Sequence, residues 1–288
     1  MGISEALIEG QAQGVLVAAE RPNGLGVIVL TGSSGRVDVA RARLFAELGA
    51  AAFAQRWWGG EGQAAGVNEI PIETVLRGVD LLLAEGCERI AILGTSFGAG
   101  AALLAAVYDP RVDVCIAISP TAVVWQNSGP SADGSAWPPR SQFTWEGRPL
   151  PFVVLDPRPW PPAGTPNPSY RRMHEQSLRT FAEDVPAATI PVERARADLI
   201  LVAGGADALW PSDTAAREIA GRLARNGRQA VLIEHPHAGH CPVFPGEAWR
   251  AAPPERAWGG GEAADRALGA LAWDAIVEVL GLGRAASL

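Results

Sequence analysis

The sequence Gly94-Thr95-Ser96-Phe97-Gly98 decides the expected fold, because of the segments on either side of it. The apolar run 89–93 before it predicts a strand, and the small-residue segment 97–108 predicts a helix. A G-x-S-x-G pattern at such a joint is typical of a strained turn that exposes the serine hydroxyl, with the helix N-terminus directed at an oxyanion. We interpret Ser96 as a nucleophile. The alternative is an ordinary joint between a strand and a helix.

Strand and helix signals alternate on both sides of this motif. Short strands separated by helices of this length indicate a parallel sheet covered by helices on both faces. The fold class is therefore α/β, and we expect one domain over 1–288. The sequence predicts further strands at 26–30, 50–55, 114–118, 199–203 and 229–234, and further helices at 38–48, from Pro71 through Leu83, at 213–226 and at 263–280.

Residues 130–168 interrupt the alternation. They contain eleven of the 23 prolines, which remove backbone donors and end helices. A helix predicted at 169–185 closes this part of the chain. We interpret the segment of about 126–189 as a lid insertion over a site, and a flexible surface loop is the alternative.

A serine nucleophile needs a base, and three of the four histidines stand in His235-Pro236-His237-Ala238-Gly239-His240. This segment follows a predicted strand, so it reaches the same edge of the sheet as Ser96. We favour His240, because the preceding Ala-Gly allows a flexible turn, and His237 is the alternative. His174, in the predicted lid helix, is interpreted as a solvated histidine. A three-histidine zinc site is conceivable, but the prolines and the lack of a carboxylate-rich partner argue against it.

The orienting carboxylate is expected at Asp207, in the turn after strand 199–203. The competitor, Asp213, is explained by capping of the following helix. The order serine, aspartate, histidine is that of α/β-hydrolases. The oxyanion hole is expected from the backbone N–H groups of Phe97 and Ser33, with Ser34 as the alternative. A phosphate-binding P-loop is excluded, because all 24 basic residues are arginines.

Composition excludes several classes of protein. A net charge of -7 with no basic run argues against nucleic-acid binding, and no apolar stretch approaches the ~18 residues of a membrane span. Three irregularly spaced cysteines form neither a disulfide framework nor a metal pair, and the first residues lack the pattern of a signal peptide. We expect a cytoplasmic protein that acts on a small molecule and needs no cofactor or metal.

The chain resembles the α/β-hydrolase domain of the bile acid-CoA:amino acid N-acyltransferase and acyl-CoA thioester hydrolase family. The similarity spans roughly 14–245, and besides the three candidate residues it rests on a set of short motifs. The resemblance implies Ser96 as nucleophile, Asp207 and His240 as its partners, and acyl transfer from a thioester to water or an amine. The motifs are Ile70-Pro71-Ile72-Glu73, Ser119-Pro120, Val123-Val124-Trp125-Gln126, Ile190-Pro191-Val192-Glu193, Trp210-Pro211-Ser212 and Ala238-Gly239-His240.

Two departures from that family refine the expected function. Its animal members carry an N-terminal β-sandwich domain for which this chain has no room, and its amine-conjugating members have cysteine at the position of Ser96. We therefore expect a serine hydrolase that cleaves a thioester or ester of an apolar acyl group. An acyltransferase using an amine or alcohol, and a non-hydrolytic ligand-binding protein, are the alternatives.

Tryptophan is over-represented, with ten residues against two tyrosines. Eight of the ten map to loops expected around Ser96, and this distribution predicts a wide, aromatic-lined acyl pocket. Simple packing of tryptophans between the lid and the sheet is the alternative. The candidate substrate-binding residues are Trp57, Trp58, Trp125 and Trp210, and the arginines that could meet phosphates are Arg36, Arg41, Arg43 and Arg56.

Overall fold

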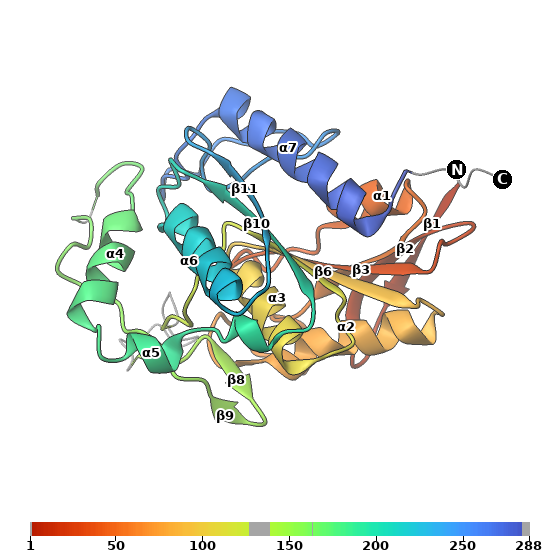
Figure 1. Ribbon diagram of the computed structural model, residues 1–288, viewed down its shortest axis with the longest axis horizontal. Coiled ribbons are helices and arrows are strands. Elements are labelled where there is room, and N and C mark those ends of the chain that lie inside the picture. Colours follow the sequence, from red (N-terminus) through yellow and green to blue (C-terminus); the bar gives the residue numbers. More distant parts are fainter. Residues whose placement is uncertain (1, 127–138, 163, 284–288) are drawn as a thin grey trace.

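The computed structural model describes residues 2–126, 139–162 and 164–283 (Figure 1). Its main sheet has eight strands in the order β1-β2-β4-β3-β6-β7-β10-β11. The strands from β4 to β11 are parallel, and β2 pairs antiparallel with both β1 and β4. The strands are β1 Ile3–Ile8, β2 Gln13–Ala19, β3 Leu25–Leu30, β4 Ala51–Arg56, β6 Arg89–Thr95, β7 Val114–Ile118, β10 Asp198–Gly204 and β11 Val231–His235.

Helices cover both faces of this sheet, as the alternation of the sequence predicted. Helices α1 (Val39–Ala46) and α7 (Glu262–Leu280) pack on one face. Helices α2 (Ile72–Ala84), α3 (Phe97–Tyr108) and α6 (Ser212–Arg225) pack on the other (Figure 1). Sequence periodicity therefore gave the right class, and the fold is that of the α/β-hydrolases.

The helix α3 is small-residue-rich because it is almost entirely buried. Its alanines and glycines allow close contact with the central strands β6 and β7, where larger side chains would hold the helix away. This close contact brings the start of α3 directly over the sheet edge at which the parallel strands end.

The N-terminal hairpin of β1 and β2 was not predicted. The edge strand β1 is exposed over most of its length, so its sequence lacks the continuous apolar run that marked the buried strands, whereas β2 does carry such a run at 15–19, which the sequence analysis did not use. The hairpin extends the sheet on the side away from β11, and none of the predicted site residues lies in it.

The insertion contains more regular structure than the loop-rich segment that was predicted. Strand β8 (Phe143–Trp145) pairs with β9 (Arg148–Pro149) and with β5 (Ile70–Pro71), forming a separate three-stranded sheet. The single helix predicted at 169–185 is wrong, because the chain turns between α4 (Arg171–Thr180) and α5 (Val185–Ala188). The short 3-10 helix η1 (Val192–Arg194) then leads into β10.

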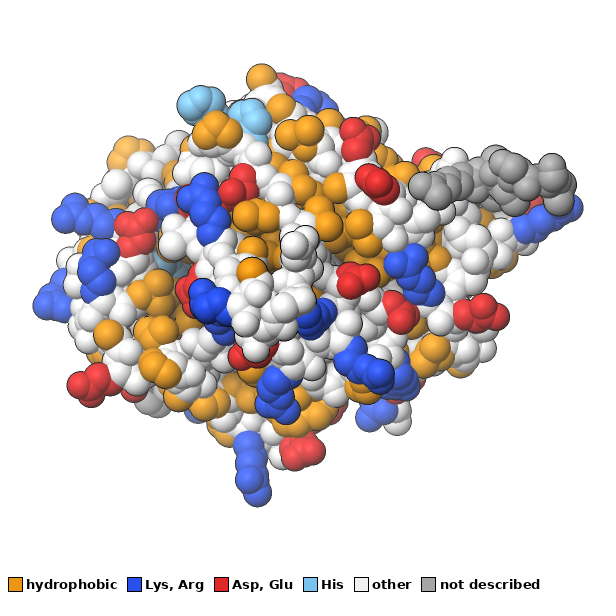
Figure 2. Space-filling model, in the orientation of Figure 1, with side chains coloured by type: hydrophobic (Ala, Val, Ile, Leu, Met, Phe, Trp, Pro, Cys, Tyr) orange, Lys and Arg blue, Asp and Glu red, His pale blue; other side chains and the backbone are white. Residues whose placement is uncertain are grey.

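The charges on the surface and the apolarity of the helices agree with what the composition of the sequence predicted. The face in Figure 2 carries arginine and carboxylate side chains interspersed with one another. In the three described ranges, no helix has the length and apolarity that a bilayer crossing requires.

Candidate active site

Ser96 occupies a strained turn between β6 and α3. Its backbone has φ 61° and ψ -123°, a conformation that residues other than glycine rarely adopt. The Ser96 N–H donates to the carbonyl of Ile118 in the neighbouring strand β7, at 2.8 Å. The turn is therefore held by the sheet in a conformation that projects the side chain away from both the strand and the helix.

The two glycines of the motif are required by close backbone contacts. A Cβ placed on Gly94 would lie 2.0 Å from the carbonyl oxygen of Gly98, and one on Gly98 would lie 2.5 Å from that of Thr31. Neither carbonyl is at the end of a flexible side chain, so substitution at these positions must shift the backbone.

We expect Gly94→Ala to lower the free energy of unfolding by about 3 kcal/mol, because the added methyl group overlaps backbone atoms. Gly100 provides a matched control in the same segment, since a Cβ there meets nothing closer than 3.6 Å. Gly100→Ala should stabilise the protein by about 0.5 to 1 kcal/mol, the gain in helix propensity. Urea unfolding measures both, and equal stabilities of the two variants would contradict the steric argument.

Three side chains form one hydrogen-bonded chain at this turn. The Nε2 atom of His240 lies 2.7 Å from Ser96 Oγ, and its Nδ1 atom lies 2.8 Å from Asp207 Oδ2. Asp207 and His240 are 1% and 2% exposed. The fold thus brings together the serine, histidine and aspartate that the sequence singled out, although Ser96 is more than a hundred residues away from the other two along the chain.

The carboxylate of Asp207 is fixed by several donors besides His240. Its Oδ1 accepts from the backbone N–H groups of Leu209 (2.9 Å) and Trp210 (3.3 Å). Its Oδ2 also accepts from the hydroxyl of Ser212, at 2.6 Å. Sequence reasoning missed Ser212, since a serine at the start of a helix is most simply explained by the helix itself. The carboxylate therefore has a fixed orientation toward the imidazole.

The backbone around His240 is held from two sides. The His240 N–H donates to the carbonyl of Trp258, and its carbonyl accepts from the buried hydroxyl of Ser119. The ring of Trp210 lies edge-on to the imidazole, with centroids 4.9 Å apart, and its Nε1–H donates to the Ser119 carbonyl. Segments following β7, β10 and β11 thus jointly position one histidine.

The alternative candidates for the base and for the carboxylate lie elsewhere. The rings of His235 and His237 lie against each other, with their centroids 6.1 Å apart, while His240 is directed toward Ser96. Asp213 forms an ion pair with Arg171 of α4. Among the described residues, no cluster of three or more His, Cys, Asp or Glu side chains is placed to hold a metal ion. Burial raises the pKa of the neighbouring Cys241 thiol to about 12, so it stays protonated at neutral pH.

His174 was interpreted as a solvated histidine, and this was wrong. Its ring is buried between Trp125 and Trp210, and its Nδ1 lies 3.0 Å from the Tyr170 carbonyl. Burial lowers the pKa of His174 to about 4, so it is uncharged at neutral pH. It packs behind Trp210, the residue that contacts His240.

The positions predicted for an oxyanion hole lie beside Ser96. Phe97 and Gly98 open α3, and the first N–H groups of a helix have no partner within it. Gly32 lies against the turn, where a Cβ would be 3.0 Å from the Cβ of Ser96, and the exposed Ser33 follows it. The role of the Phe97 and Ser33 amides in binding an oxyanion stays a prediction.

Comparison with known proteins identifies the family. The sequence profile described as "BAAT / Acyl-CoA thioester hydrolase C terminal" matches residues 81–281, more than half of the chain. The chain belongs to this family. The resemblance predicted from the sequence is thereby confirmed, and family and fold together make the protein an α/β-hydrolase enzyme. No curated protein sequence matches it.

Solved structures agree on the fold of this BAAT/acyl-CoA thioester hydrolase family member. A protein assigned as a dienelactone hydrolase from Klebsiella pneumoniae shares 16% identity and a TM-score of 0.57, with 97% of this chain and 98% of that chain covered. A dienelactone hydrolase-like promiscuous phosphotriesterase from metagenomic libraries shares 15% identity and a TM-score of 0.55, with 97% of each chain covered. At these identities the similarity establishes the fold alone.

In this family member, a cavity of about 650 Å³ opens beside Ser96 and His240. Its walls come from the loop after β3, from α1 and from the long loop between β11 and α7. No described residue between 126 and 189 lines it, so the described part of the insertion does not form its wall. The apolar lining residues include Val29, Leu30, Ala40, Leu44, Leu209, Pro242, Val243, Pro253 and Trp258.

The predicted tryptophan pocket is not the cavity that the fold builds. None of Trp57, Trp58, Trp125 and Trp210 is among its described lining residues, and the tryptophan that lines it is Trp258. Trp57 is buried and stacks on the ring of Phe97 at 5.1 Å. Trp125 is buried in the hydrophobic cluster of the insertion, and its Nε1–H donates to Thr121. Trp137 lies outside the described residues. Trp57 and Trp125 therefore pack inside the protein and do not line this cavity as predicted.

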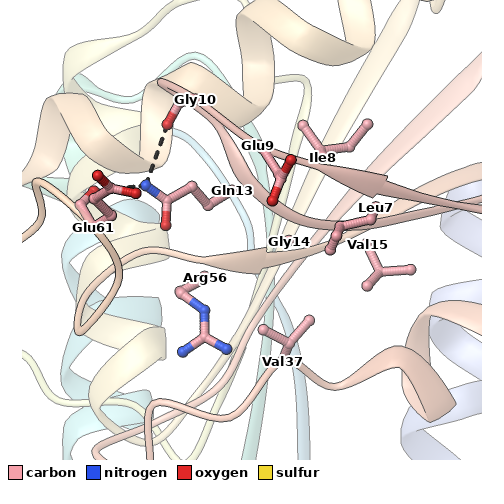
Figure 3. Close-up of a pocket in the computed structure, with 10 residues that line it drawn as sticks. All are labelled: Leu7, Ile8, Glu9, Gly10, Gln13, Gly14, Val15, Val37, Arg56 and Glu61. Atoms are coloured by element: carbon pink, nitrogen blue, oxygen red, sulfur yellow. Dashed lines mark hydrogen bonds between the residues drawn. The ribbon is translucent and has the colours of Figure 1, made fainter.

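A second cavity, of about 540 Å³, lies at the N-terminal hairpin (Figure 3). Gln13 lies between Gly10 and Glu61 and donates hydrogen bonds to both of their carbonyls. Arg56, one of the arginines considered for phosphate binding, lies here with the carboxylates of Glu9 and Glu61 and not beside Ser96. This cavity contains no part of the hydrogen-bonded chain of Ser96, His240 and Asp207.

A nearly buried ion pair joins the turn to the wall of the larger cavity. The Nε and Nη2 atoms of Arg41 donate to the two oxygens of the Glu247 carboxylate, at 2.7 and 2.8 Å. Its Nη1 atom donates to Thr95 Oγ1, at 2.9 Å. The Arg41 and Glu247 side chains are 10% and 15% exposed. Helix α1, the residue before Ser96 and the loop after His240 are thereby held together.

Arg41→Met should lower the free energy of unfolding by about 3 kcal/mol, because it leaves the Glu247 carboxylate without its partner in a poorly solvated place. The double variant Arg41→Met/Glu247→Leu should lose less than the sum of the single variants, by about 1 to 3 kcal/mol. Urea unfolding of the four proteins measures this coupling. Strictly additive losses would show that the pair contributes no interaction of its own.

Proposed function

We propose that the protein is a serine hydrolase that cleaves a thioester or ester of an apolar acyl group through a covalent acyl-enzyme. The observation that carries this proposal is the continuous hydrogen-bonded chain from Ser96 through His240 to Asp207, which opens onto a cavity with an apolar wall. Membership in the acyl-CoA thioester hydrolase family supports the same chemistry.

In the first half of the reaction, Ser96 Oγ attacks the carbonyl carbon of the substrate. The Nε2 atom of His240 accepts the hydroxyl proton, and the imidazolium that forms is stabilised by the carboxylate of Asp207. The carbonyl oxygen becomes an oxyanion, for which the amides of Phe97 and Ser33 are the proposed donors. Collapse of this intermediate breaks the bond to sulfur or oxygen, and His240 returns the proton to the leaving thiolate or alkoxide.

In the second half, water attacks the acyl ester on Ser96. His240 accepts a proton from the water, and the second tetrahedral intermediate uses the same oxyanion donors. The bond to Ser96 Oγ then breaks, the proton returns from His240 to the serine, and the free carboxylic acid leaves. The fixed carboxylate of Asp207, with its three other donors, keeps the imidazole in the tautomer that both halves require.

The test is the mass of the intact protein after rapid mixing with a panel of acyl thioesters and esters. We expect a transient adduct with the mass of the acyl group, and peptide mapping should place it on Ser96. A fluorophosphonate, which traps activated serines, should label the same residue stoichiometrically. Labelling at another residue, or no adduct with either type of reagent, would overturn the proposed function.

A further inference from the structure

The cavity beside Ser96 contains an excess of positive charge. Four arginines line it, Arg36, Arg41, Arg250 and Arg256, against two carboxylates, Asp38 and Glu247. The chain as a whole has a net charge of -7, so this local excess is opposite in sign to that of the protein. Such a concentration of one sign in a cavity favours ligands of the opposite sign.

The six charged side chains that line the cavity fall into two sets according to their partners. Arg41 is neutralised by Glu247, and the Asp38 carboxylate accepts from the backbone N–H of Arg41 at the start of α1. In the described part of the chain, Arg36, Arg250 and Arg256 form no ion pair, and the side-chain nitrogens of Arg36 donate one hydrogen bond, to the Ser34 hydroxyl. Three guanidinium groups therefore remain available within one cavity.

These three arginines line the same cavity as the reacting serine. Arg36 comes from the loop after β3, and Arg250 and Arg256 come from the loop between β11 and α7, so they converge from two segments. All three are exposed, whereas among the lining residues of the same cavity Ser96 is half-buried and His240 is buried. A substrate whose carbonyl reaches Ser96 would thus have its outer part beside the guanidinium groups.

From this arrangement we infer that the substrate of the proposed hydrolase carries an anionic group, a carboxylate or a phosphate, that Arg36, Arg250 and Arg256 bind at the cavity mouth. The planar guanidinium forms paired hydrogen bonds with either anion. This inference rests on the proposed function, because it concerns the substrate of the same serine. The anionic group could belong to the acyl part or to the leaving group, and the experiment separates these sources.

The experiment compares two matched pairs of substrates. 4-Nitrophenyl hemisuccinate and 4-nitrophenyl butyrate differ by a carboxylate on the acyl part. Butyryl-CoA and butyryl-N-acetylcysteamine share the acyl group and the thiol end of the leaving group, and only the CoA ester carries phosphates, together with the rest of the pantetheine and the adenosine. For each pair, the ratio of kcat/KM for the anionic to the neutral substrate is measured in the wild type and in the variant Arg36→Gln/Arg250→Gln/Arg256→Gln.

We expect the triple variant to lower this ratio by about 3- to 100-fold for at least one pair, the combined effect of three exposed charge contacts. The pair that responds identifies the part of the substrate with the anion. In the wild type the ratio should also fall as salt is added, and in the triple variant this dependence should weaken, which a purely structural role would not produce. Arg225→Gln, an exposed arginine of α6 outside the cavity, is the matched control.

Two failures can be told apart. If Ser96 is acylated and both ratios are the same in the wild type and the triple variant, the anionic-substrate inference is overturned and the proposed function stands. If no substrate of either pair acylates Ser96 and no product forms, both are overturned together.

Discussion

Replacing Ser96 with alanine is expected to lower kcat/KM for a thioester or ester substrate by about 10⁴-fold or more. The alanine removes the oxygen that attacks the carbonyl and leaves the cavity, His240 and Asp207 in place. The Cβ at φ 61° is retained, and the one lost hydrogen bond is to His240 Nε2. The free energy of unfolding should therefore change by less than about 1 kcal/mol.

Steady-state kinetics and urea unfolding, applied to the same preparations, separate chemistry from folding in this variant. Ser4→Ala is the matched control, since the exposed Ser4 lies in the edge strand β1, far from the cavity in sequence and in the sheet. Turnover of the Ser96→Ala variant within tenfold of the wild type would remove the serine from the mechanism.

Replacing Asp207 with asparagine is expected to have the second large effect, which is a loss of about 10³- to 10⁴-fold in kcat. In the wild type, Oδ1 accepts from the amides of Leu209 and Trp210, while Oδ2 faces His240. The asparagine oxygen should take the place of Oδ1, because only an oxygen can accept those two bonds. Its NH₂ group then faces Nδ1 of His240 and donates to it, which leaves the proton on Nε2.

An imidazole protonated at Nε2 cannot accept the proton of Ser96, so the loss arises from the wrong tautomer and not from a changed shape. The matched control is Asp198→Asn, an exposed carboxylate at the opposite end of β10. Kinetics should show a wild-type kcat for this control, and circular dichroism should show the native fold for both variants. A kcat of Asp207→Asn close to that of Asp198→Asn would contradict the proposed role of the carboxylate.

Much of the fold could be predicted because its signals are local. The strand 114–118 and the helix 97–108 have the bounds expected from their apolar and small residues. The turn at Ser96 was also identifiable, since it requires glycine at two positions within five residues. Strand β1 could not be predicted because an exposed edge strand does not carry a continuous apolar run, although its partner β2 does.

The candidate site likewise has residues that could be predicted from the sequence and residues that could not. Ser96, Asp207 and His240 each follow a predicted parallel strand, and such strands end at one edge of a sheet, so their meeting could be expected. Ser212 and Ser119, which hold Asp207 and the His240 backbone, stand in two of the motifs behind the family resemblance, but those motifs did not reveal their contacts, which depend on the folded arrangement of the loops.

The sequence by itself determined the fold class, the family and the three residues at the sheet edge, because periodicity, glycine requirements and strand order are properties of short segments. Only the tertiary structure decided what surrounds Ser96. It buried Trp57 and Trp125 as packing residues and made the loop between β11 and α7, with Trp258, Arg250 and Arg256, a wall of the cavity. The physical reason is that a tryptophan beside a strand end can face either a core or a cavity, and distant segments of the chain decide between them.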